Sequence, residues 1–276
     1  MHYTDLHIHS KYSDGILSPE EIVRISCKKG IQYISITDHD TIDSQYIIES
    51  SKNKYDTMII SGIELSTEYK GREIHILGYF IDIYNKDLIS ILSTIKESRI
   101  VRAKEIIRKL NTINIDISFE DIYEEGASIG RPHIAKILVN KGFAKNTKDA
   151  FQQYLVNGKP GYVDRYKINY KDALKIISMC NGISVLAHPG EVYRGISIEE
   201  IIKEFKVYGL KGLEVFHPSH SVKQTNDYYN LSKKYSLIIT GGSDCHGLMH
   251  DNDLLIGTSG LDPKLTYKFL RSSYIK

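Results

Sequence analysis

The stretch YTDLHIHS at residues 3–10 is followed, after a short turn, by SPEE at residues 18–21. Residues 3–10 are predicted to form a β-strand, because β-forming side chains dominate and turn residues follow them. Ser18 and Glu21 have the spacing of a helix capping box, with Pro19 at the first helical position. The stretch therefore predicts a strand that leads into an amphipathic helix, as in α/β proteins.

The same alternation recurs along the chain. A second Ser-x-x-Glu capping box lies at residues 197–200, whereas residues 68–72 are too short for a helix and suit a hairpin-like turn. About seven strands that alternate with helices favour an irregular parallel α/β barrel over a sandwich. After the first run, the predicted strands lie at residues 33–37, 58–67, 73–80, 182–187, 210–216 and 237–241.

The segment from residue 88 to residue 164 breaks this rhythm. Apolar residues repeat at helical spacing over a long stretch that begins near Leu88, and shorter helices are predicted at residues 132–140 and 148–155. We therefore expect a barrel from residues 1–87 and 165–276, with an inserted helical subdomain at 88–164. A long barrel helix with a decorated loop is the alternative.

The amino-acid composition restricts the expected cellular location and the expected binding partners. The net charge of +2 comes from 36 basic and 34 acidic residues mixed along the chain, so no basic stripe indicates nucleic acid. Cys27, Cys180 and Cys245 are odd in number and widely spaced, which favours a reducing cytoplasm over a disulfide framework. No apolar stretch approaches the roughly 18–20 residues that cross a bilayer. We expect a cytoplasmic protein without membrane contact and without an obligate protein partner.

Side chains that can bind metal ions follow nearly every predicted strand. The two-residue period of His7-x-His9, and of Asp244-x-His246, directs both members of each pair to one side. Mixed histidine and carboxylate ligands suit Zn, Mn, Fe or Mg-type ions, and so many candidates imply two or three ions. The candidates, which include seven of the eleven histidines, are His7, His9, Asp14, His39, Glu64, His75, His188, His217, Asp244 and His246.

Three neighbours of these candidates have other expected roles. Asp38 and Asp40 flank His39 and could orient ligands, although Asp40 could instead cap the helix that starts near Thr41. Cys245 is expected to point away from the site, because strand alternation separates it from its neighbours.

A set of motifs in order along the chain resembles the PHP (polymerase and histidinol phosphatase) family. The resemblance rests on DLHIHS (5–10), YSDG (12–15), TDHDT (37–41), GIE (62–64), HILGY (75–79), AHPG (187–190) and GSDCHG (242–247). It implies a distorted seven-stranded, TIM-like β/α barrel with a trinuclear metal site. By this resemblance one ion takes His7, His9, Glu64 and Asp244, a second takes Asp14, His39 and His246, and a third takes His75 and His188 with Glu64 bridging.

The helical insert narrows the resemblance within that family. GRPHIA (130–135), Phe151 with Tyr154 and Leu155, and GKPGYV (158–163) resemble the branch that acts on nucleoside 3′,5′-bisphosphates, on 5′-nucleotides or on short 5′-phosphorylated RNA. Arg131 and His133 at a helix start would bind substrate phosphate, with the insert as a substrate cap. The alternative is that both residues only cap that helix or pair with a surface carboxylate.

The resemblance and the ligand set together predict a metal-dependent phosphoesterase. Three divalent ions (Mn, Fe or Zn, with Mg possible) would activate a water molecule for attack on a phosphate monoester. Asp14 and Glu64 are predicted to be catalytic through the metals, and His217 is predicted to bind phosphate or to protonate the leaving oxygen.

Three other functions remain open at this stage. A metal-dependent amidohydrolase also begins its barrel with His-x-His, but it normally has a bridging lysine where this chain has Glu64 and His75. A histidinol-phosphate phosphatase, or another small-metabolite phosphatase, is a second alternative, which the insert with Arg131 disfavours but does not exclude. A non-catalytic metal-containing interaction module would not require every ligand to be present.

Overall fold

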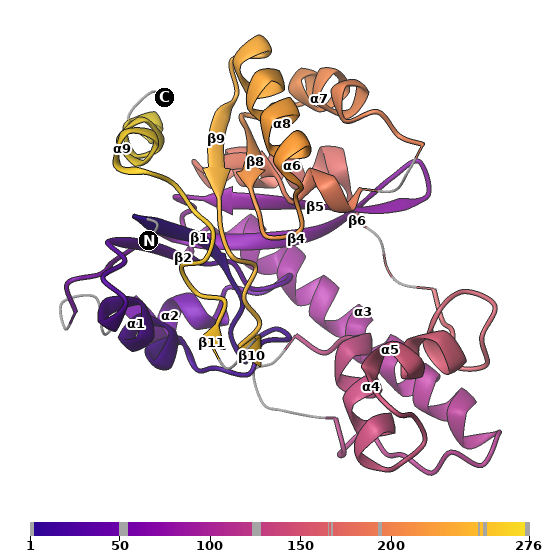
Figure 1. Cartoon of the computed structure of the whole chain (residues 1–276). Coiled ribbons are helices and arrows are strands. Elements are labelled where there is room, and N and C mark those ends of the chain that lie inside the picture. Colours follow the sequence, from indigo (N-terminus) through magenta and orange to yellow (C-terminus); the bar gives the residue numbers. More distant parts are fainter. Residues whose placement is uncertain are drawn as a thin grey trace. The chain divides into compact units, whose positions relative to one another are not determined.

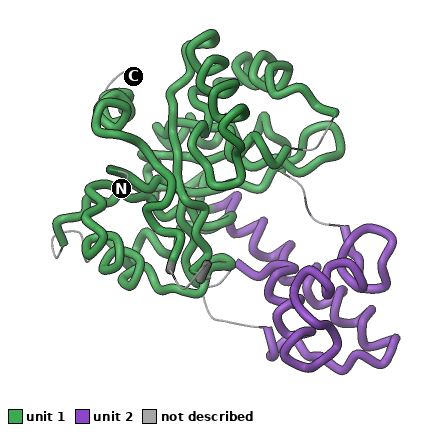
Figure 2. Tube along the Cα trace, viewed as in Figure 1, with its two compact units in different colours: residues 1–89, 167–276 green, residues 90–166 purple. Residues whose placement is uncertain are grey.

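The computed structural model describes residues 3–49, 55–122, 128–164, 166, 168–192, 195–247, 249–250 and 253–273. The chain divides into two compact units, Met1–Ile89 with Lys167–Lys276, and Ser90–Tyr166 (Figure 2). The first unit is built from both ends of the chain and the second from its middle.

The strands of the first unit form two main sheets and a small hairpin (Figure 1). One sheet has the order β1 (Thr4–Ile8), β2 (Tyr33–Ile36), β3 (Met58–Ile59). The other has the order β6 (Ile168–Asn169), β4 (Gly62–Tyr69), β5 (Arg72–Tyr79), β7 (Ile183–Leu186), β8 (Gly212–Phe216), β9 (Ile238–Gly241). The hairpin pairs β10 (Met249–His250) with β11 (Asp253–Leu254).

The sheets are mixed: the antiparallel pair β4–β5 was expected from the short segment at residues 68–72, whereas the antiparallel pair β5–β7 departs from the expected parallel barrel. β4 and β5 pair antiparallel, and β5 pairs antiparallel with β7, whereas β1–β2, β7–β8 and β8–β9 are parallel. The cause is the tight turn at Lys70 and Gly71, both at positive φ, which leaves no room for a crossover helix.

Two isolated parallel bridges join the two main sheets. Ile8 bridges to Cys245, where the N–H of His9 donates to the Cys245 carbonyl at 3.0 Å. His39 bridges to Glu64, whose N–H donates to the Asp38 carbonyl at 3.2 Å. The segment after β9 therefore pairs with the end of β1, and the segment after β2 pairs with β4.

The predicted strand at residues 58–67 is divided into two in the structure. Met58 and Ile59 pair with β2, whereas the residues from Gly62 onward pair with β5. The predicted strand therefore contributes to both main sheets. The partner strand changes from β2 to β5 between Ile59 and Gly62.

Helices flank the strands of the first unit: α1 (Pro19–Lys28), α2 (Asp43–Glu49), α6 (Tyr170–Met179), α7 (Ile198–Val207), α8 (Val222–Lys234), α9 (Pro263–Ser272) and a 3₁₀ turn at Pro189–Glu191. The predicted capping box of α1 is present, with the N–H of Glu21 donating to Ser18 Oγ at 3.2 Å and the N–H of Ser18 donating to Glu21 Oε2 at 2.8 Å. Ile22 and Val23 of this helix are fully buried in one apolar cluster with Ile8 and Ile34. Burial of this face stabilises α1.

The second unit is helical where the structure describes it. Its helices are α4 (Arg131–Asn140), α5 (Thr147–Ala150) and a π-helical turn (Phe151–Leu155), together with most of α3 (Lys86–Asn111), which starts in the first unit. Ile106, Leu110, Ile134, Leu138 and Leu155 form part of its own core. Among the described residues of both units, no helix combines the length and the apolar character needed to span a bilayer.

Candidate metal centre

β1 delivers two histidines to one side of the first unit. Leu6 and Ile8 belong to apolar clusters, and His7 and His9 alternate with them, as the two-residue period of a strand requires. Both histidines are fully buried, and their Nε2 atoms lie 3.1 Å apart. The two rings therefore direct nitrogen atoms toward one point.

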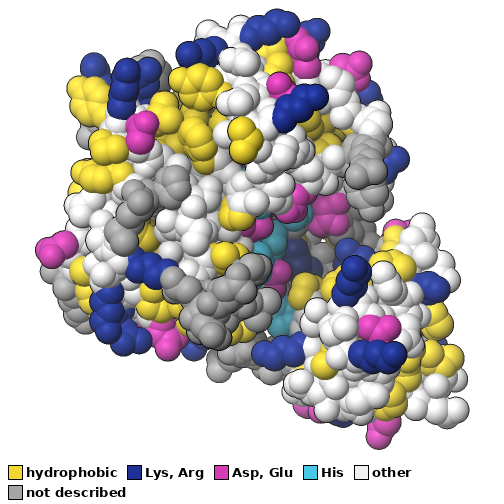
Figure 3. Space-filling model, viewed as in Figure 1, with side chains coloured by type: hydrophobic (Ala, Val, Ile, Leu, Met, Phe, Trp, Pro, Cys, Tyr) yellow, Lys and Arg dark blue, Asp and Glu magenta, His cyan; other side chains and the backbone are white. Residues whose placement is uncertain are grey.

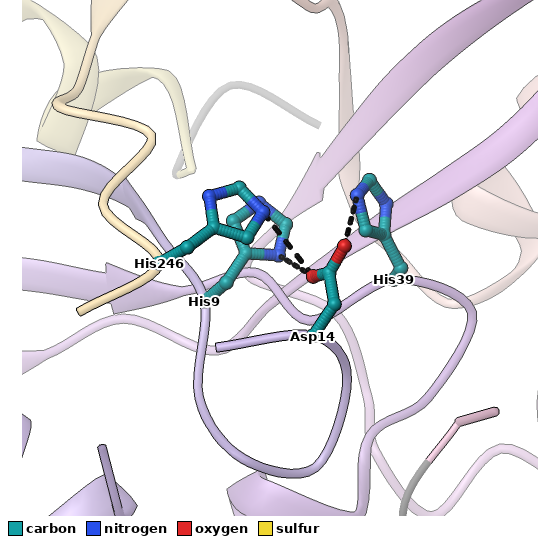
Figure 4. Close-up of side chains that lie close together, drawn as sticks. All are labelled: His9, Asp14, His39 and His246. Carbon is teal, nitrogen blue, oxygen red and sulfur yellow. Dashed lines mark ion pairs between the residues drawn. The ribbon is translucent and has the colours of Figure 1, made fainter. Parts of the chain in front are cut away.

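Asp14 faces three histidines from the loop that follows β1. Figure 4 shows its carboxylate between His9, His39 and His246. Its Oδ1 lies 3.2 Å from His246 Nε2 and 3.8 Å from His9 Nδ1, and its Oδ2 lies 3.9 Å from His39 Nε2. Residues from three separate segments of the chain thus surround one carboxylate.

Asp38 holds the loop that carries Asp14. Its Oδ1 accepts the N–H of Ser10 and the hydroxyl of Ser13, each at 2.7 Å, and its Oδ2 accepts the hydroxyl of Ser10 at 2.7 Å. Asp40, for which a helix cap was an alternative role, uses Oδ1 to accept the N–H of Ser66 at 2.8 Å. Both aspartates therefore support the segments around the site.

Glu64 lies at the centre of the cluster. It is fully buried on β4, where its Oε2 is 3.3 Å from the Nε2 atoms of both His7 and His9. The same oxygen lies 3.0 Å from His39 Nδ1, and Oε1 lies 3.1 Å from His75 Nδ1 and 3.0 Å from His188 Nε2. One carboxylate thus contacts five imidazoles.

Asp244 follows β9 in a strained conformation. Its φ of 51° is in the left-handed region, and its N–H donates to the carbonyl of His7 at 2.8 Å. Its Oδ1 lies 3.3 Å from His7 Nε2 and 3.0 Å from His9 Nε2. A Cβ at nearby Gly242 would lie 2.3 Å from the His7 nitrogen, so only glycine permits this approach of the two segments.

All nine predicted ligands lie in four overlapping groups. Within each group the candidate ligand atoms are within 4.8 Å of one another. The groups are His9, Asp14, His39 and His246; His7, His9 and Asp244; His7, Glu64 and His188; and His39, Glu64 and His75. His75 and His188, which the family resemblance places on one ion, fall in separate groups that share Glu64. Histidine and acidic side chains are visible together near the centre of Figure 3.

Several buried polar atoms in these four groups have no hydrogen-bond partner within the described part of the chain, which indicates that the groups bind cations. Among the described residues, Asp14 Oδ1, His39 Nδ1 and Glu64 Oε2 are buried and have no hydrogen-bond partner. Buried polar atoms normally have partners, and atoms that converge on a shared space can be satisfied together by a divalent ion. The donor set of imidazole and carboxylate is that of zinc, iron and manganese proteins.

Charges in the site shift the pKa values strongly. Burial lowers the pKa of His9, but Asp244 and Glu64 outweigh burial and raise this pKa to about 10. Burial raises the pKa of Glu64, yet His39, His7 and His75 hold it well below its usual range. Burial is the main cause that lowers the pKa of His39, to about 4. The carboxylates thus stay ionised and attract positive charge.

His217 follows β8 and lies beside the cluster. Its Nε2 is 3.4 Å from Asp244 Oδ2, and no described residue gives this nitrogen a hydrogen bond. The other nitrogen, Nδ1, accepts the N–H of Ser219 at 3.2 Å. The hydroxyl of Ser219 lies 2.7 Å from the same nitrogen, so Ser219 holds the ring and leaves Nε2 next to Asp244.

Arg131 and His133 lie in the second unit. The N–H of Gly130 donates to His133 Nδ1 at 3.1 Å, so this histidine caps its own helix. Arg131 donates from Nη1 to the Leu155 carbonyl at 3.5 Å, and its guanidinium lies 5.6 Å from the centre of the Phe151 ring. These contacts match the capping alternative for His133, and they place Arg131 against the π-helical turn.

Sequence reasoning missed two buried carboxylates near the ligands. Glu214 on β8 and Asp5 on β1 are both fully buried. Burial raises the pKa of Asp5 to about 6, and its oxygens accept the N–H groups of Ser243 and Gly257 at 2.9 and 2.8 Å. A charged residue inside an apolar strand run was the available signal in both cases.

Comparison with known proteins assigns the family. The sequence signature of the PHP domain matches residues 5–177 of the chain. The chain belongs to the PHP family. The PHP signature covers the segments that carry His7 to His75, whereas His188, Asp244 and His246 lie beyond it.

Curated PHP relatives and a solved structure support this assignment. The 3′,5′-nucleoside bisphosphate phosphatase of Chromobacterium violaceum is 31% identical over 88% of this chain and 86% of the relative. The 5′-3′ exoribonuclease of Haemophilus influenzae is 32% identical over 88% and 89%. A Bifidobacterium adolescentis protein assigned as a metal-dependent phosphoesterase superposes with a TM-score of 0.88, at 26% identity, over 97% of this chain and 95% of that one.

Proposed function

We propose that this PHP protein is a metal-dependent phosphoesterase that hydrolyses phosphate monoesters of nucleotides. The observation that carries the proposal is the convergence of nine buried or half-buried histidines and carboxylates in four overlapping groups. Relatives that match most of the chain act on phosphate esters of nucleosides or on RNA, according to their names.

We propose three divalent ions, of manganese, iron or zinc, with magnesium as a further candidate. Bound ions of this kind lower the pKa of a water molecule and neutralise charge on a phosphoryl group. Glu64 supports more than one ion, because both of its oxygens face imidazoles. Asp14, which lies in the group with His9, His39 and His246, is the second carboxylate on which catalysis would depend.

The role of His217 follows from the orientation of its ring. When protonated, Nε2 would donate a hydrogen bond to a phosphoryl oxygen, or a proton to the leaving oxygen, because Ser219 contacts the other nitrogen, Nδ1. The nitrogen lies beside Asp244 and none of the four ligand groups includes it, so it is a candidate for substrate contact.

The finer architecture is also part of the proposal. The bridges Ile8–Cys245 and His39–Glu64 support a distorted seven-stranded barrel of β1, β2, β4, β5, β7, β8 and β9. Residues 88–164 would be the inserted substrate cap, with Arg131 and His133 contributing to phosphate binding. Cys27, Cys180 and Cys245 are free thiols, which supports a cytoplasmic location.

A substrate screen tests the function directly. Metal-stripped full-length protein is reloaded with Mn²⁺, Fe²⁺, Zn²⁺ or Mg²⁺ and offered nucleoside 3′,5′-bisphosphates, 5′-monophosphates, histidinol phosphate and 5′-phosphorylated oligoribonucleotides. We expect phosphate release from the nucleotides to exceed that from histidinol phosphate. Absence of release from every nucleotide would refute the substrate class, and absence of bound metal would refute the metal centre.

RNA is the second substrate that a specific observation favours. The exoribonuclease relative of Haemophilus influenzae matches this chain over as much of its length as the phosphatase relative does. Mononucleotide release from the 5′ end of the oligoribonucleotides would establish that activity, whereas removal of the terminal phosphate alone would limit the enzyme to monoesters.

A further inference from the structure

Glu214 is a buried carboxylate that the proposed chemistry does not use. It lies in the middle of β8, in the run GLEVF, where Leu213 and Val215 are fully buried. Its own side chain has no exposed surface. It belongs to none of the four candidate ligand groups. An ionised side chain at such a position costs free energy unless it has strong partners.

Among the described residues, each oxygen of Glu214 contacts one atom of a candidate metal ligand. Oε1 lies 3.0 Å from Nδ1 of His7, and Oε2 accepts the main-chain N–H of His188 at 2.7 Å. The two histidines come from β1 and from the turn after β7. One carboxylate therefore links two ligands that are far apart in the sequence.

The contact between Glu214 and His7 selects one tautomer of the His7 imidazole. Nε2 of His7 faces Glu64 and Asp244, at 3.3 Å from each. A neutral imidazole that binds a metal ion through Nε2 must carry its proton on Nδ1, and a carboxylate at Nδ1 accepts that proton in a hydrogen bond. Glu214 thus favours the His7 tautomer that is protonated on Nδ1, in which Nε2 has a free lone pair for a metal ion.

The contact with His188 holds a strained main chain. His188 has φ 23° and ψ 63°, which is an unfavourable conformation for a residue with a Cβ atom. Its N–H is bound by Glu214, and two residues later the N–H of Gly190 donates to Nε2 of His220 at 3.1 Å. Groups from β8 and the loop after it therefore secure the turn on both sides of the histidine.

We propose that Glu214 is a positioning residue that fixes the ring of His7 and the main chain of His188 for metal binding. The proposal rests on the metal centre described above. A purely structural role for Glu214 would make its loss destabilise the fold and leave the metal affinity of the folded protein unchanged.

The test is the Mn²⁺ affinity of Glu214→Gln, measured by titration of the metal-stripped full-length protein below its unfolding temperature. Glutamine has one acceptor oxygen and one NH₂ group, so it cannot accept from both His7 and His188. Loss of an outer partner of this kind weakens metal binding by about 10–100-fold, and we expect a loss in that range.

Glu204→Gln is the matched control. Glu204 on α7 is also a carboxylate with two donors, because the hydroxyls of Tyr69 and Tyr170 each donate to it at 2.6 Å. It belongs to none of the candidate ligand groups, so this variant should keep the wild-type Mn²⁺ affinity.

The results of these titrations distinguish a failure of the proposed role of Glu214 from a failure of the proposed metal-dependent function. Wild-type Mn²⁺ affinity in Glu214→Gln would overturn the role of Glu214 alone, whereas a wild-type protein that binds no metal would overturn both. If the variant does not fold, nitrogen NMR of the Zn²⁺-loaded wild-type protein decides. We expect the proton of His7 on Nδ1, and an unprotonated Nδ1 would refute the proposal.

Discussion

Oδ1 of Asp244 lies between two imidazole nitrogens, 3.3 Å from His7 Nε2 and 3.0 Å from His9 Nε2. The two nitrogens are themselves 3.1 Å apart. Nitrogen lone pairs repel at this distance unless protons or a cation lie between them. The relationship predicts that metal ions stabilise the folded chain as well as support its chemistry.

Removal of metal should lower both activity and stability. Ligands at about 100 times their Kd add about 2.7 kcal/mol per site to the free energy of unfolding. We therefore expect EDTA treatment followed by dialysis to lower the Tm measured by calorimetry, and Mn²⁺ to restore it together with phosphate release. Unchanged Tm and full activity in protein shown to be metal-free would contradict the prediction.

Glu64→Gln should abolish most of the activity. The substitution keeps the size of the side chain but removes the charge that faces five imidazoles. Since loss of an outer partner already costs about 10–100-fold, loss of a carboxylate that is proposed to bridge ions should reduce kcat/KM by more than about 100-fold. Metal content by mass spectrometry should fall in parallel. Near wild-type activity in this variant, or in Glu64→Ala, would refute the central role of Glu64.

Substitution of His217 should lower the catalytic rate without changing the metal content. General acid catalysis contributes about 10²–10⁴-fold, so His217→Ala should lower kcat by that order while the metal content stays at the wild-type level. His217→Gln keeps a donor near the Nε2 position but cannot transfer its proton. Recovery of kcat in the glutamine variant would therefore identify a hydrogen-bond role, and no recovery would identify proton transfer.

Gly242→Ala should disturb the contact between the segments after β9 and β1. The added Cβ would lie 2.3 Å from the main-chain nitrogen of His7, so the main chain must move. We expect a loss of about 1–3 kcal/mol in the free energy of unfolding, together with weaker metal binding. Gly130→Ala is the comparison, because its Cβ would come no closer than 3.3 Å to its neighbours, the end of the Arg99 side chain and Cδ of Pro132. Equal effects of the two variants would argue against the close approach.

The contact of Glu204 with two tyrosines should make stability depend on pH. Hydrogen bonds from Tyr170 and Tyr69 lower the pKa of Glu204 in the folded protein. The stabilisation is therefore present above the unfolded pKa of about 4.3 and is lost as pH falls through the lower folded value. Glu204→Gln should lower Tm at pH 7, and the difference from wild type should shrink below about pH 4. A difference independent of pH would contradict this account.

The candidate ligands could be found from the sequence because their signals are local. His7-x-His9 combines a strand period with ligand chemistry, and the capping box at Ser18 is also a pattern of neighbouring residues. The strand period does not describe Asp244-x-His246, because both residues follow β9 and Asp244 has a φ of 51°. The hairpin between β4 and β5 followed from the short segment with Lys70 and Gly71. These features depend on few residues and on backbone geometry alone.

The supporting contacts could not be found in the same way. Glu214 lies 207 residues from His7, and Asp5 lies 238 residues from Ser243, so no sequence spacing links these partners. The antiparallel pairing of β5 with β7 and the division of residues 58–67 depend on which strands become neighbours. The contacts of the His217 ring with the N–H and the hydroxyl of Ser219 likewise depend on the local main-chain conformation after β8.

The bridge between Ile8 and Cys245 has a consequence for how the protein is made. His7 and His9 are synthesised long before Asp244 and His246, which lie after β9. A nascent chain therefore holds an incomplete set of candidate ligands until the segment after β9 has emerged, and contacts over such sequence separations form slowly. We therefore expect metal loading to follow the synthesis of that segment.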